Sequence, residues 1–256
     1  MTGRISLRHG SISIQYGLSV LAGVAACFLA ASCSPDPQKI VDQCIRVHGG
    51  EKYLKSEIEF DFRDRHYIAR RNGGLFSKER ILRDSLTVTH DFLTNDGFIR
   101  KINEAAISIP DSMAAKYTAS INAVIYFALL PYALNDPDVH KKLLGLTDME
   151  GQPYYRVEVT FGPGAGEGHQ DTFYYWIHEK NLTLDYFAYY YQEDGQWEFR
   201  FRKAYGRRDV GGILFQDYIN YKPGEPGQQF ENVEALFKSN GLKELSRIEL
   251  RNLSVK

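Results

Sequence analysis

Short runs in which apolar and polar residues alternate constrain the fold of this chain more than any other feature. Val157, Val159 and Phe161 alternate with polar residues, and this period of two indicates a strand with one buried face. Turn signals such as Asn72-Gly73-Gly74 separate the runs. The chain lacks the strand–helix–strand alternation of parallel folds. We therefore predict about ten antiparallel strands in a sandwich or barrel. The first strand begins near residue 59 and includes Arg63 and Arg65, and the others cover 75–83, 86–93, 97–102, 156–161, 172–179, 182–191, 197–202, 213–221 and 244–253.

Two long helices and a short third helix near 232–238 are expected among the strands. Asp36-Pro37 is typical of a helix start and the following Gly-Gly pair of a helix end, which predicts a helix over 36–48. A second helix over 111–134 is apolar almost all round in its second half, with Asn122 as the polar exception. This helix is either a lid or plug across a concave sheet or a plain core helix. In both cases Asn122 needs a hydrogen-bond partner.

The N-terminus has the pattern of a secretory signal. Arg4 and Arg8 precede an apolar stretch that ends in small residues before Cys33, and the stretch is short for a spanning helix. The sequence before Cys33 is similar to a bacterial lipobox, although Ala30 stands where a large aliphatic residue is usual. We predict a lipoprotein signal peptide over 1–32, with Cys33 as the lipid-attachment residue and acyl chains such as palmitate as the membrane anchor. Plain secretion with cleavage near Ala31 is the alternative.

The cysteine count and the charge narrow the class of protein further. Cys27 lies in the signal and lipidation consumes Cys33, so Cys44 alone remains and no internal disulfide is expected. The mature chain, 33–256, has the size of a single β-rich domain. A formal net charge of −1 and a pI of about 6.7 exclude the basic surface typical of nucleic-acid-binding domains.

Familiar catalytic motifs are absent from the sequence. There is no Gly-x-Ser-x-Gly elbow, no P-loop, no dinucleotide fingerprint and no His-Glu-x-x-His zinc motif. Glu167, His169 and Asp171 lie on or just after the Gly-rich segment 162–168, where a cation site is one interpretation and a solvated polar loop the favoured one. We therefore expect neither a metal nor a cofactor.

Arginines and aromatic rings form the candidate site. Arg63 and Arg65 are expected on one face of the first strand, and Arg200 and Arg202 on one face of a later strand. In one interpretation these arginines pair with acidic residues across the sheet. In the other they line the rim of a cavity, extended by Tyr205 and Arg207, and bind an anionic headgroup or carboxylate. The expected ligand-binding residues are Arg63, Arg65, Asn122, Tyr126, Trp176, Tyr186, Arg200, Arg202 and Tyr205.

Eight stretches spread over the chain carry a family resemblance: His48–Gly50, Phe62–Tyr67, Ser120–Phe127, Leu130–Asp136, Tyr175–Ile177, Asp185–Tyr189, Phe199–Tyr205 and Phe215–Tyr218. They resemble a domain-of-unknown-function family of Bacteroidota-type envelope lipoproteins. The resemblance implies an α+β, mainly β fold similar to the lipoprotein carriers. That fold is a curved antiparallel sheet or half-open β-barrel with helices on its concave side. Acyl chains in such a cavity are implied by fold analogy alone. Residues 33–37 lack the acidic run that resembles a surface-export signal, so an outer-membrane location facing the periplasm is expected.

Three functions remain open at this point. The favoured one is a membrane-anchored module that binds a lipid or other amphiphile, because the aromatic strands, the apolar helix and the arginine rim suit such a ligand. The second is an envelope enzyme of unknown reaction that uses Asp64, His66, Asp185 or Arg202. The third is a scaffold or interaction lipoprotein with a filled core and no ligand site.

Overall fold

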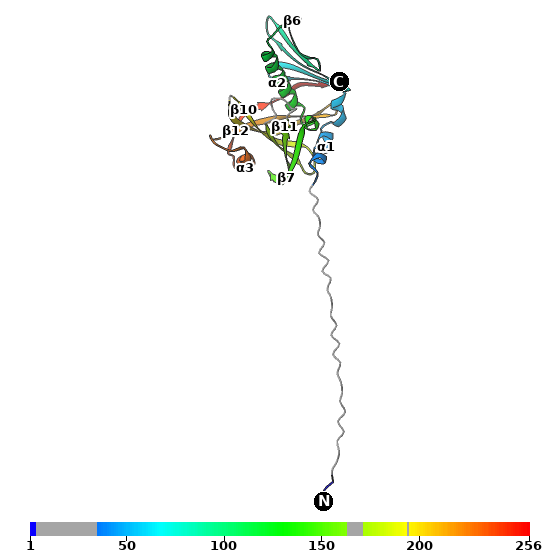
Figure 1. The fold of residues 1–256 in the computed structure, drawn as a ribbon, viewed down its shortest axis with the longest axis vertical. Coiled ribbons are helices and arrows are strands. Elements are labelled where there is room, and N and C mark those ends of the chain that lie inside the picture. The colour runs from blue at the N-terminus through cyan, green and yellow to red at the C-terminus, as the bar shows by residue number, and fades with distance from the viewer. Residues whose placement is uncertain (4–34, 163–170, 194) are drawn as a thin grey trace. The chain divides into compact units, whose positions relative to one another are not determined.

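The computed structural model describes residues 1–3, 35–162, 171–193 and 195–256 (Figure 1). The predicted signal peptide lies almost entirely outside these residues, and so do Cys33, Glu167 and His169. Residues Pro35–Lys256 form one compact unit. No helix within the described ranges has the length and apolar character needed to cross a membrane.

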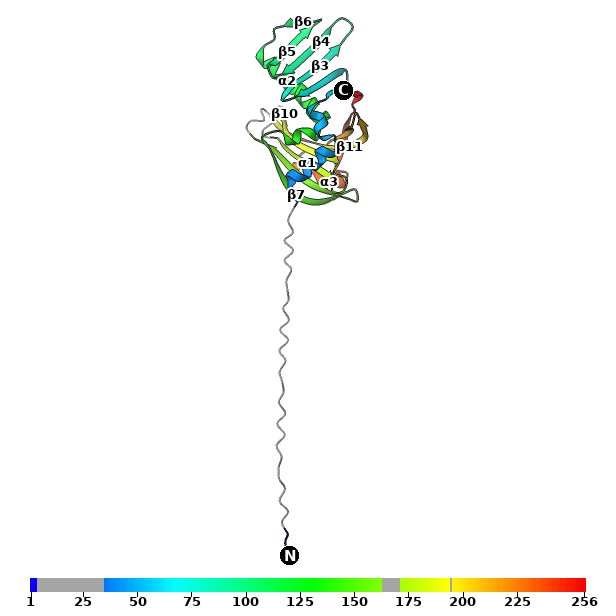
Figure 2. The ribbon, with the colours of Figure 1, turned by 90° about the vertical axis from the view of Figure 1, so that its right-hand side faces the viewer.

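Two antiparallel sheets make up most of this unit. Sheet A has the order β14-β1-β2-β3-β4-β5-β6 and sheet B the order β13-β12-β11-β10-β9-β8-β7 (Figures 1 and 2). Each sheet ends in two different edge strands, so neither closes on itself. The predicted mainly β, antiparallel and half-open architecture is therefore confirmed. The strands are β1 (Glu57–Phe62), β2 (Arg65–Asn72), β3 (Leu75–Arg83), β4 (Val88–Thr94), β5 (Gly97–Ile102), β6 (Ala105–Ile107), β7 (Val139–Met149), β8 (Gln152–Phe161), β9 (Thr172–His178), β10 (Leu184–Glu193), β11 (Gln196–Val210), β12 (Ile213–Pro223), β13 (Leu242–Ile248) and β14 (Arg251–Val255).

The described residues contain fourteen strands, whereas the sequence indicates about ten. The first expected strand is divided at Arg63, which adopts a φ of 57° in the turn between β1 and β2. The prediction that Arg63 and Arg65 share one face of a strand is wrong for this reason. The last expected strand is divided at Leu250, where the chain leaves sheet B for sheet A. The pattern also misses β6 and β7, and β7 leaves Leu144 and Leu146 exposed.

Helix α2 (Asp111–Ala128) packs on one face of sheet A, which we call the inner face. Ile121 and Ile125 of α2 cluster there with Phe60 and Tyr67, and α2 contacts β3 and β5 (Figure 2). Burying each of these side chains stabilises the fold by about 1.5–3 kcal/mol. The helix ends at Ala128 rather than at residue 134, and a 3-10 helix, η2 (Tyr132–Asn135), follows.

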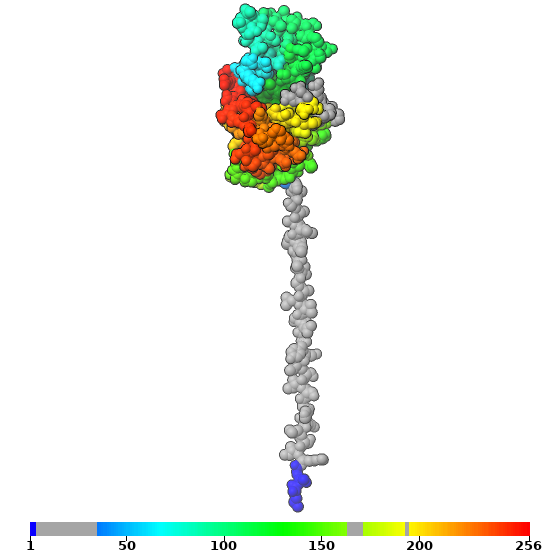
Figure 3. Space-filling view, turned by 90° about the vertical axis from the view of Figure 1, so that its left-hand side faces the viewer, coloured from blue at the N-terminus to red at the C-terminus, as the bar shows by residue number. Residues whose placement is uncertain are grey.

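Sheet B is covered by helices on both faces. Helix α1 (Pro37–Val47) packs on the face that contains Val157 and Tyr175, which we call the α1/α2 face because the end of α2 also reaches it. Helix α3 (Val233–Lys238) covers the opposite face together with η4 (Phe230–Asn232). Figure 3 looks onto a side of the molecule where the orange and red residues after about 220 form much of the surface. The two longer predicted helices thus share one face of sheet B, whereas α3, which confirms the short helix predicted near 232–238, lies on the other.

Helix α1 begins and ends as the sequence predicts. Asp36 caps it, with Oδ1 accepting from the backbone N–H of Gln38 at 2.9 Å. After its last turn, the buried His48 joins the helix to sheet B. Its Nε2 accepts from the N–H of Leu184 at 3.2 Å and its Nδ1 donates to the carbonyl of Leu214 at 3.3 Å. This arrangement needs a neutral ring, and burial together with the positive charge of Arg207 lowers the pKa of His48 to about 4.

Candidate functional site

A cavity of about 250 Å³ lies between α2, the end of β1 and the strands β11, β12 and β13. Its volume is slightly below the range of ordinary small-molecule pockets, ~300–1,000 Å³. Its lining is mainly apolar and includes no Asp or Glu. The lining residues are Phe62, Arg63, Ala123, Val124, Phe127, Ala128, Arg202, Gln216, Tyr218, Asn220, Ser246, Ile248 and Leu250.

The cavity explains why α2 is apolar almost all round. One stripe of the helix, with Ile121 and Ile125, is buried against sheet A. A second stripe, with Val124 and Phe127, is only half-buried and faces the cavity. A plain core helix accounts for the first stripe but not for the second. The second stripe gives the cavity an apolar wall.

Arg202 on β11 supplies the main charge of the cavity. Its side chain is buried, and its guanidinium lies 4.1 Å from the centre of the Phe127 ring. Its Nη2 donates to the hydroxyl of Tyr189 at 3.0 Å. Its Nε has no hydrogen-bond partner, and no carboxylate within the described part of the chain pairs with it. A buried cation without an anionic partner is costly, so a ligand anion would stabilise it.

Polar groups continue from Arg202 across the edge of sheet B. Arg202 pairs with Asn220 on β12, and Asn220 pairs with Ser246 on β13, so the three side chains form a row on one face. Asn220 is buried, and its Nδ2 donates to Oγ of Ser246 at 3.2 Å, while its Oδ1 has no partner. The cavity therefore has an unused donor on Arg202 and an unused acceptor on Asn220 beside its apolar wall. The sequence pattern does not single out Asn220 or Phe127.

Arg63 adds a second cation to the cavity lining. It is exposed in the turn after β1, and its guanidinium lies 5.1 Å from the centre of the Phe62 ring. Two arginines and no carboxylate line the cavity, so its potential is positive. An apolar wall beside a positive polar end is complementary to an amphiphile with an anionic head.

Asn122 and Tyr126, two further predicted residues, line a different cavity of about 350 Å³ on another side of α2. Asn122 has the partner that its burial requires, because its Oδ1 accepts from Nζ of Lys78 at 2.7 Å. Burial and the neighbouring charge of Arg71 lower the pKa of Lys78 to about 8. The hydroxyl of Tyr126 shares a hydrogen bond of 2.8 Å with the hydroxyl of Tyr175. These polar groups already satisfy one another.

Three of the predicted aromatic residues lie away from the 250 Å³ cavity. Trp176 and Tyr186 pair across β9 and β10 and pack with the core under α3, where Nε1 of Trp176 donates to Glu234 at 3.0 Å. Tyr205 donates to Glu249 at 3.1 Å. Because side chains alternate along a strand, the neighbours of Trp176 and Tyr186 face α1 and α2 instead.

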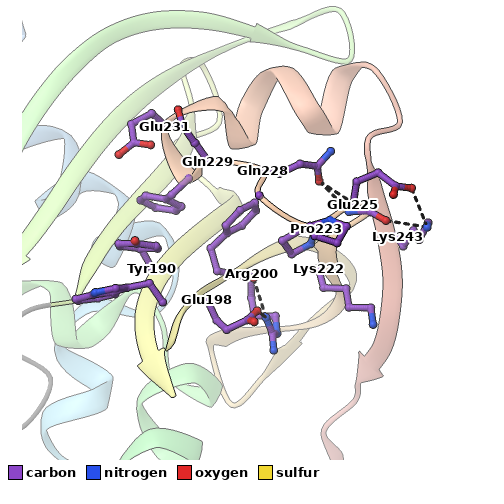
Figure 4. A pocket seen from close by; sticks show the side chains of 16 residues that line it. Tyr190, Glu198, Arg200, Lys222, Pro223, Glu225, Gln228, Gln229, Glu231 and Lys243 are labelled. Atoms are coloured by element: carbon purple, nitrogen blue, oxygen red, sulfur yellow. Dashed lines mark hydrogen bonds and ion pairs between the residues drawn. The ribbon is translucent and has the colours of Figure 1, made fainter. Parts of the chain in front are cut away.

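Arg200 lines a third cavity, which Figure 4 shows beside the loop that follows β12. This cavity has a volume of about 960 Å³. Arg200 donates to Glu198 at 3.0 Å, and Oε1 of Gln228 accepts from the backbone N–H of Gly224 at 2.9 Å. Figure 4 shows these polar groups directed toward one another, with Tyr190 on the opposite side. The cavity thus has a polar lining whose groups are largely paired. Arg65 lines none of these three cavities.

The four residues named for an enzyme are not brought together. Asp64 is exposed in the turn before β2, and Nδ1 of His66 lies 2.7 Å from Asp61 on the outer face of sheet A. Asp185 accepts from Tyr154 at 2.9 Å and from Arg207. Of the four, only Arg202 lines the 250 Å³ cavity. Among the described residues, no group of three or more His, Cys, Asp or Glu side chains is placed to hold a metal ion.

The fold and the cavity together define a mainly β protein with open antiparallel sheets and an amphipathic cavity under a helix. The chain belongs to DUF6503, a family of unknown function, whose model matches residues 24–250. No curated protein matches the chain.

Solved structures with a similar fold include a DUF1329 family protein from Desulfovibrio piger, with 14% identity and a TM-score of 0.48 over 86% of this chain and 93% of that one. A LolA superfamily protein from Nitrosomonas europaea has 10% identity and a TM-score of 0.45 over 87% and 92% of the two chains. The lipoprotein LppX of Mycobacterium tuberculosis has 12% identity and a TM-score of 0.28 over 71% and 94%.

Proposed function

We propose that the protein binds an amphiphile with an anionic head, such as a fatty acid, in the cavity between α2 and the strands β11–β13. The observation that carries this proposal is the buried Arg202, whose Nε has no partner and which lies beside an apolar wall. The ligand carboxylate would accept from Arg202 Nε, and such a charge-assisted bond contributes about 1.5–3 kcal/mol. The apolar tail would lie along Val124 and Phe127.

The size of the cavity limits how much of a ligand it holds. At ~30 Å³ for each water-sized group, a volume of about 250 Å³ takes about eight non-hydrogen atoms. Because the two carboxylate oxygens take up part of this volume, a fatty acid of about six carbons fills the cavity, and the remainder of a longer chain extends beyond it. Each methylene buried inside contributes ~0.8 kcal/mol, whereas a methylene outside contributes little.

We further propose that the protein is an envelope lipoprotein of the Bacteroidota type, held at the outer membrane and facing the periplasm. Its sequence supports this through the signal peptide pattern of residues 1–32 and the lipobox before Cys33. Two or more acyl chains on Cys33 would give stable anchoring. The anchor would hold the cavity close to a membrane, which is a source of amphiphiles. Incorporation of radiolabelled palmitate tests the anchor, and a Cys33→Ser variant that still takes up the label would refute it.

Calorimetric titration with butanoate, hexanoate and octanoate at pH 7.5 tests the ligand class. We expect the affinity to rise roughly ten-fold or more from butanoate to hexanoate, and by much less from hexanoate to octanoate, because the cavity is then full. Octanol, which has the same tail without the charge, serves as the matched control ligand and should bind more weakly. Equal binding of octanol and octanoate, or no heat with any of the carboxylates, would overturn the proposal. Native mass spectrometry of protein purified without detergent should show bound lipid.

A further inference from the structure

A cavity of about 460 Å³ lies at the other end of α2, between its first turns and the inner face of sheet A. It is separate from the proposed amphiphile cavity, and no lining residue is shared between the two. The lining residues are Arg65, Arg80, Leu82, Thr89, Asp91, Arg100, Lys116, Tyr117 and Ser120.

The strand register brings the charged residues of this cavity together. Arg80 on β3 pairs with Asp91 on β4, and Asp91 pairs with Arg100 on β5, so the three side chains form a row on the inner face. Arg65 extends from the same face of β2, because it lies two residues before Tyr67, which pairs with Arg80. Lys116 approaches from α2.

Asp91 is the one carboxylate that lines this cavity, and it is fully engaged. Its side chain is 2% exposed. It accepts from Nε and Nη2 of Arg80 at 3.0 and 2.6 Å, and from Nε and Nη2 of Arg100 at 2.6 and 2.9 Å. Four cations therefore line the cavity with one carboxylate, which leaves a formal charge of +3. The contact of Arg65 with the exposed Asp64, at 3.8 Å, offsets little of this charge.

The two central guanidinium groups are held in fixed positions. Nη1 of Arg80 donates to Oγ of Ser120 at 3.0 Å, and the guanidinium of Arg100 lies 3.5 Å from the centre of the Tyr117 ring. Asp91, Ser120 and Tyr117 thus orient the two arginines, so binding an anion there loses little side-chain entropy. Arg65 and Lys116 are more exposed and complete the cationic lining.

We propose that this cavity binds a phosphate group. Arginine presents donors in a planar fork that matches phosphate oxygens, and a dianion offsets a charge of +3 better than a single carboxylate does. The phosphate would lie between Arg65, Arg100 and Lys116, with Asp91 as a positioning residue. It belongs either to a free phosphate or to the head of a phospholipid, and the two sources are separated by experiment.

Calorimetric titration with inorganic phosphate and, separately, with short-chain phosphatidic acid below its micellar concentration tests this proposal in low-salt buffer. The test variant is the double substitution Arg65→Gln and Lys116→Met, which leaves the buried Arg80–Asp91–Arg100 row intact. The matched control is Lys101→Gln, because Lys101 follows Arg100 on β5 and faces the other side of sheet A. We expect the double variant to lose at least ten-fold in affinity and the control to lose less than two-fold.

Binding of inorganic phosphate that weakens in the double variant supports a free phosphate as the ligand. Binding of phosphatidic acid alone, with the same loss, supports a phospholipid head. No binding of either probe, or binding that the double variant leaves unchanged, overturns the proposal. Octanoate titrated into the same variants reports on the Arg202 cavity, so failure of one site is distinguishable from failure of the other.

Discussion

Replacing Arg202 with methionine separates the contribution of Arg202 to ligand binding from its contribution to the stability of the fold. Methionine keeps most of the length of the side chain and its packing against Phe127, but it removes the charge that the proposed carboxylate contacts. The lost charge-assisted hydrogen bond is worth about 1.5–3 kcal/mol. Since ~1.4 kcal/mol corresponds to a factor of ten, octanoate should bind roughly 10- to 100-fold more weakly. Calorimetric titration of the wild type and the Arg202→Met variant measures this ratio directly.

The same substitution should not destabilise the ligand-free protein by more than about 1 kcal/mol. The guanidinium loses its bond to Tyr189 and its stacking on Phe127, which together contribute ~1–3 kcal/mol. Removing a buried cation that has no carboxylate partner offsets this loss by a similar amount. Urea unfolding measures the stability, and Arg200→Met is the matched control because Arg200 pairs with Glu198 outside the cavity. Unchanged octanoate affinity in a folded Arg202→Met protein would refute the reasoning.

Three further predictions concern the stability of the fold around the proposed ligand site. The pKa of His48 is about 4 in the fold and ~6.5 in the unfolded chain. As the pH falls from 6.5 to 4, the unfolded state therefore takes up a proton first, and the free energy of unfolding falls by about 3 kcal/mol. Urea unfolding at several pH values should show this decrease, and His48→Gln should remove the part of the pH dependence that His48 causes. Gly49→Ala should lower the free energy of unfolding by ~1–3 kcal/mol, because φ at Gly49 is +136° and a Cβ there would lie 3.0 Å from Cγ1 of Ile213. Gly50→Ala is the control and should lower it by less, because a Cβ at Gly50 would meet open space. Thermal unfolding measures both variants. Trp176→Phe should lower the free energy of unfolding by ~1–3 kcal/mol, because Trp176 packs in the core under α3. The affinity for octanoate should stay unchanged, and a loss of affinity would contradict the placement of Trp176 away from the amphiphile cavity.

The sequence predicts which helices and strands form better than it predicts the residues at which they begin and end. The period-two runs and the glycine turns indicate an antiparallel, mainly β chain, and Asp36 marks the start of α1. The turn at Arg63 has no such signal, because an arginine adopts the φ of 57° that glycine or asparagine usually supplies. The order of the strands within each sheet is not predicted either. The chain passes from sheet B to sheet A at Leu250, and this passage depends on pairing between strands that are distant in sequence.

The candidate site is predictable only in part, and the reason is the burial of both faces of sheet B. Arg202 stands out in the sequence as a cation within an aromatic strand. Tyr175 and Trp176 are both fully buried, so hydrophobicity cannot show which of them faces α1 and which faces α3. Asn220 joins Arg202 only through the register of β11 and β12. These pairings are set by tertiary contacts rather than by local pattern.

A crystal structure with 6-bromohexanoate, solved with the anomalous signal of bromine, tests the proposed ligand site most directly. The bromine should lie against the apolar wall formed by Val124, Phe127 and Ile248, with the carboxylate within hydrogen-bonding distance of Arg202 Nε. A bromine peak confined to the protein surface, or a carboxylate that points away from Arg202, would contradict the account.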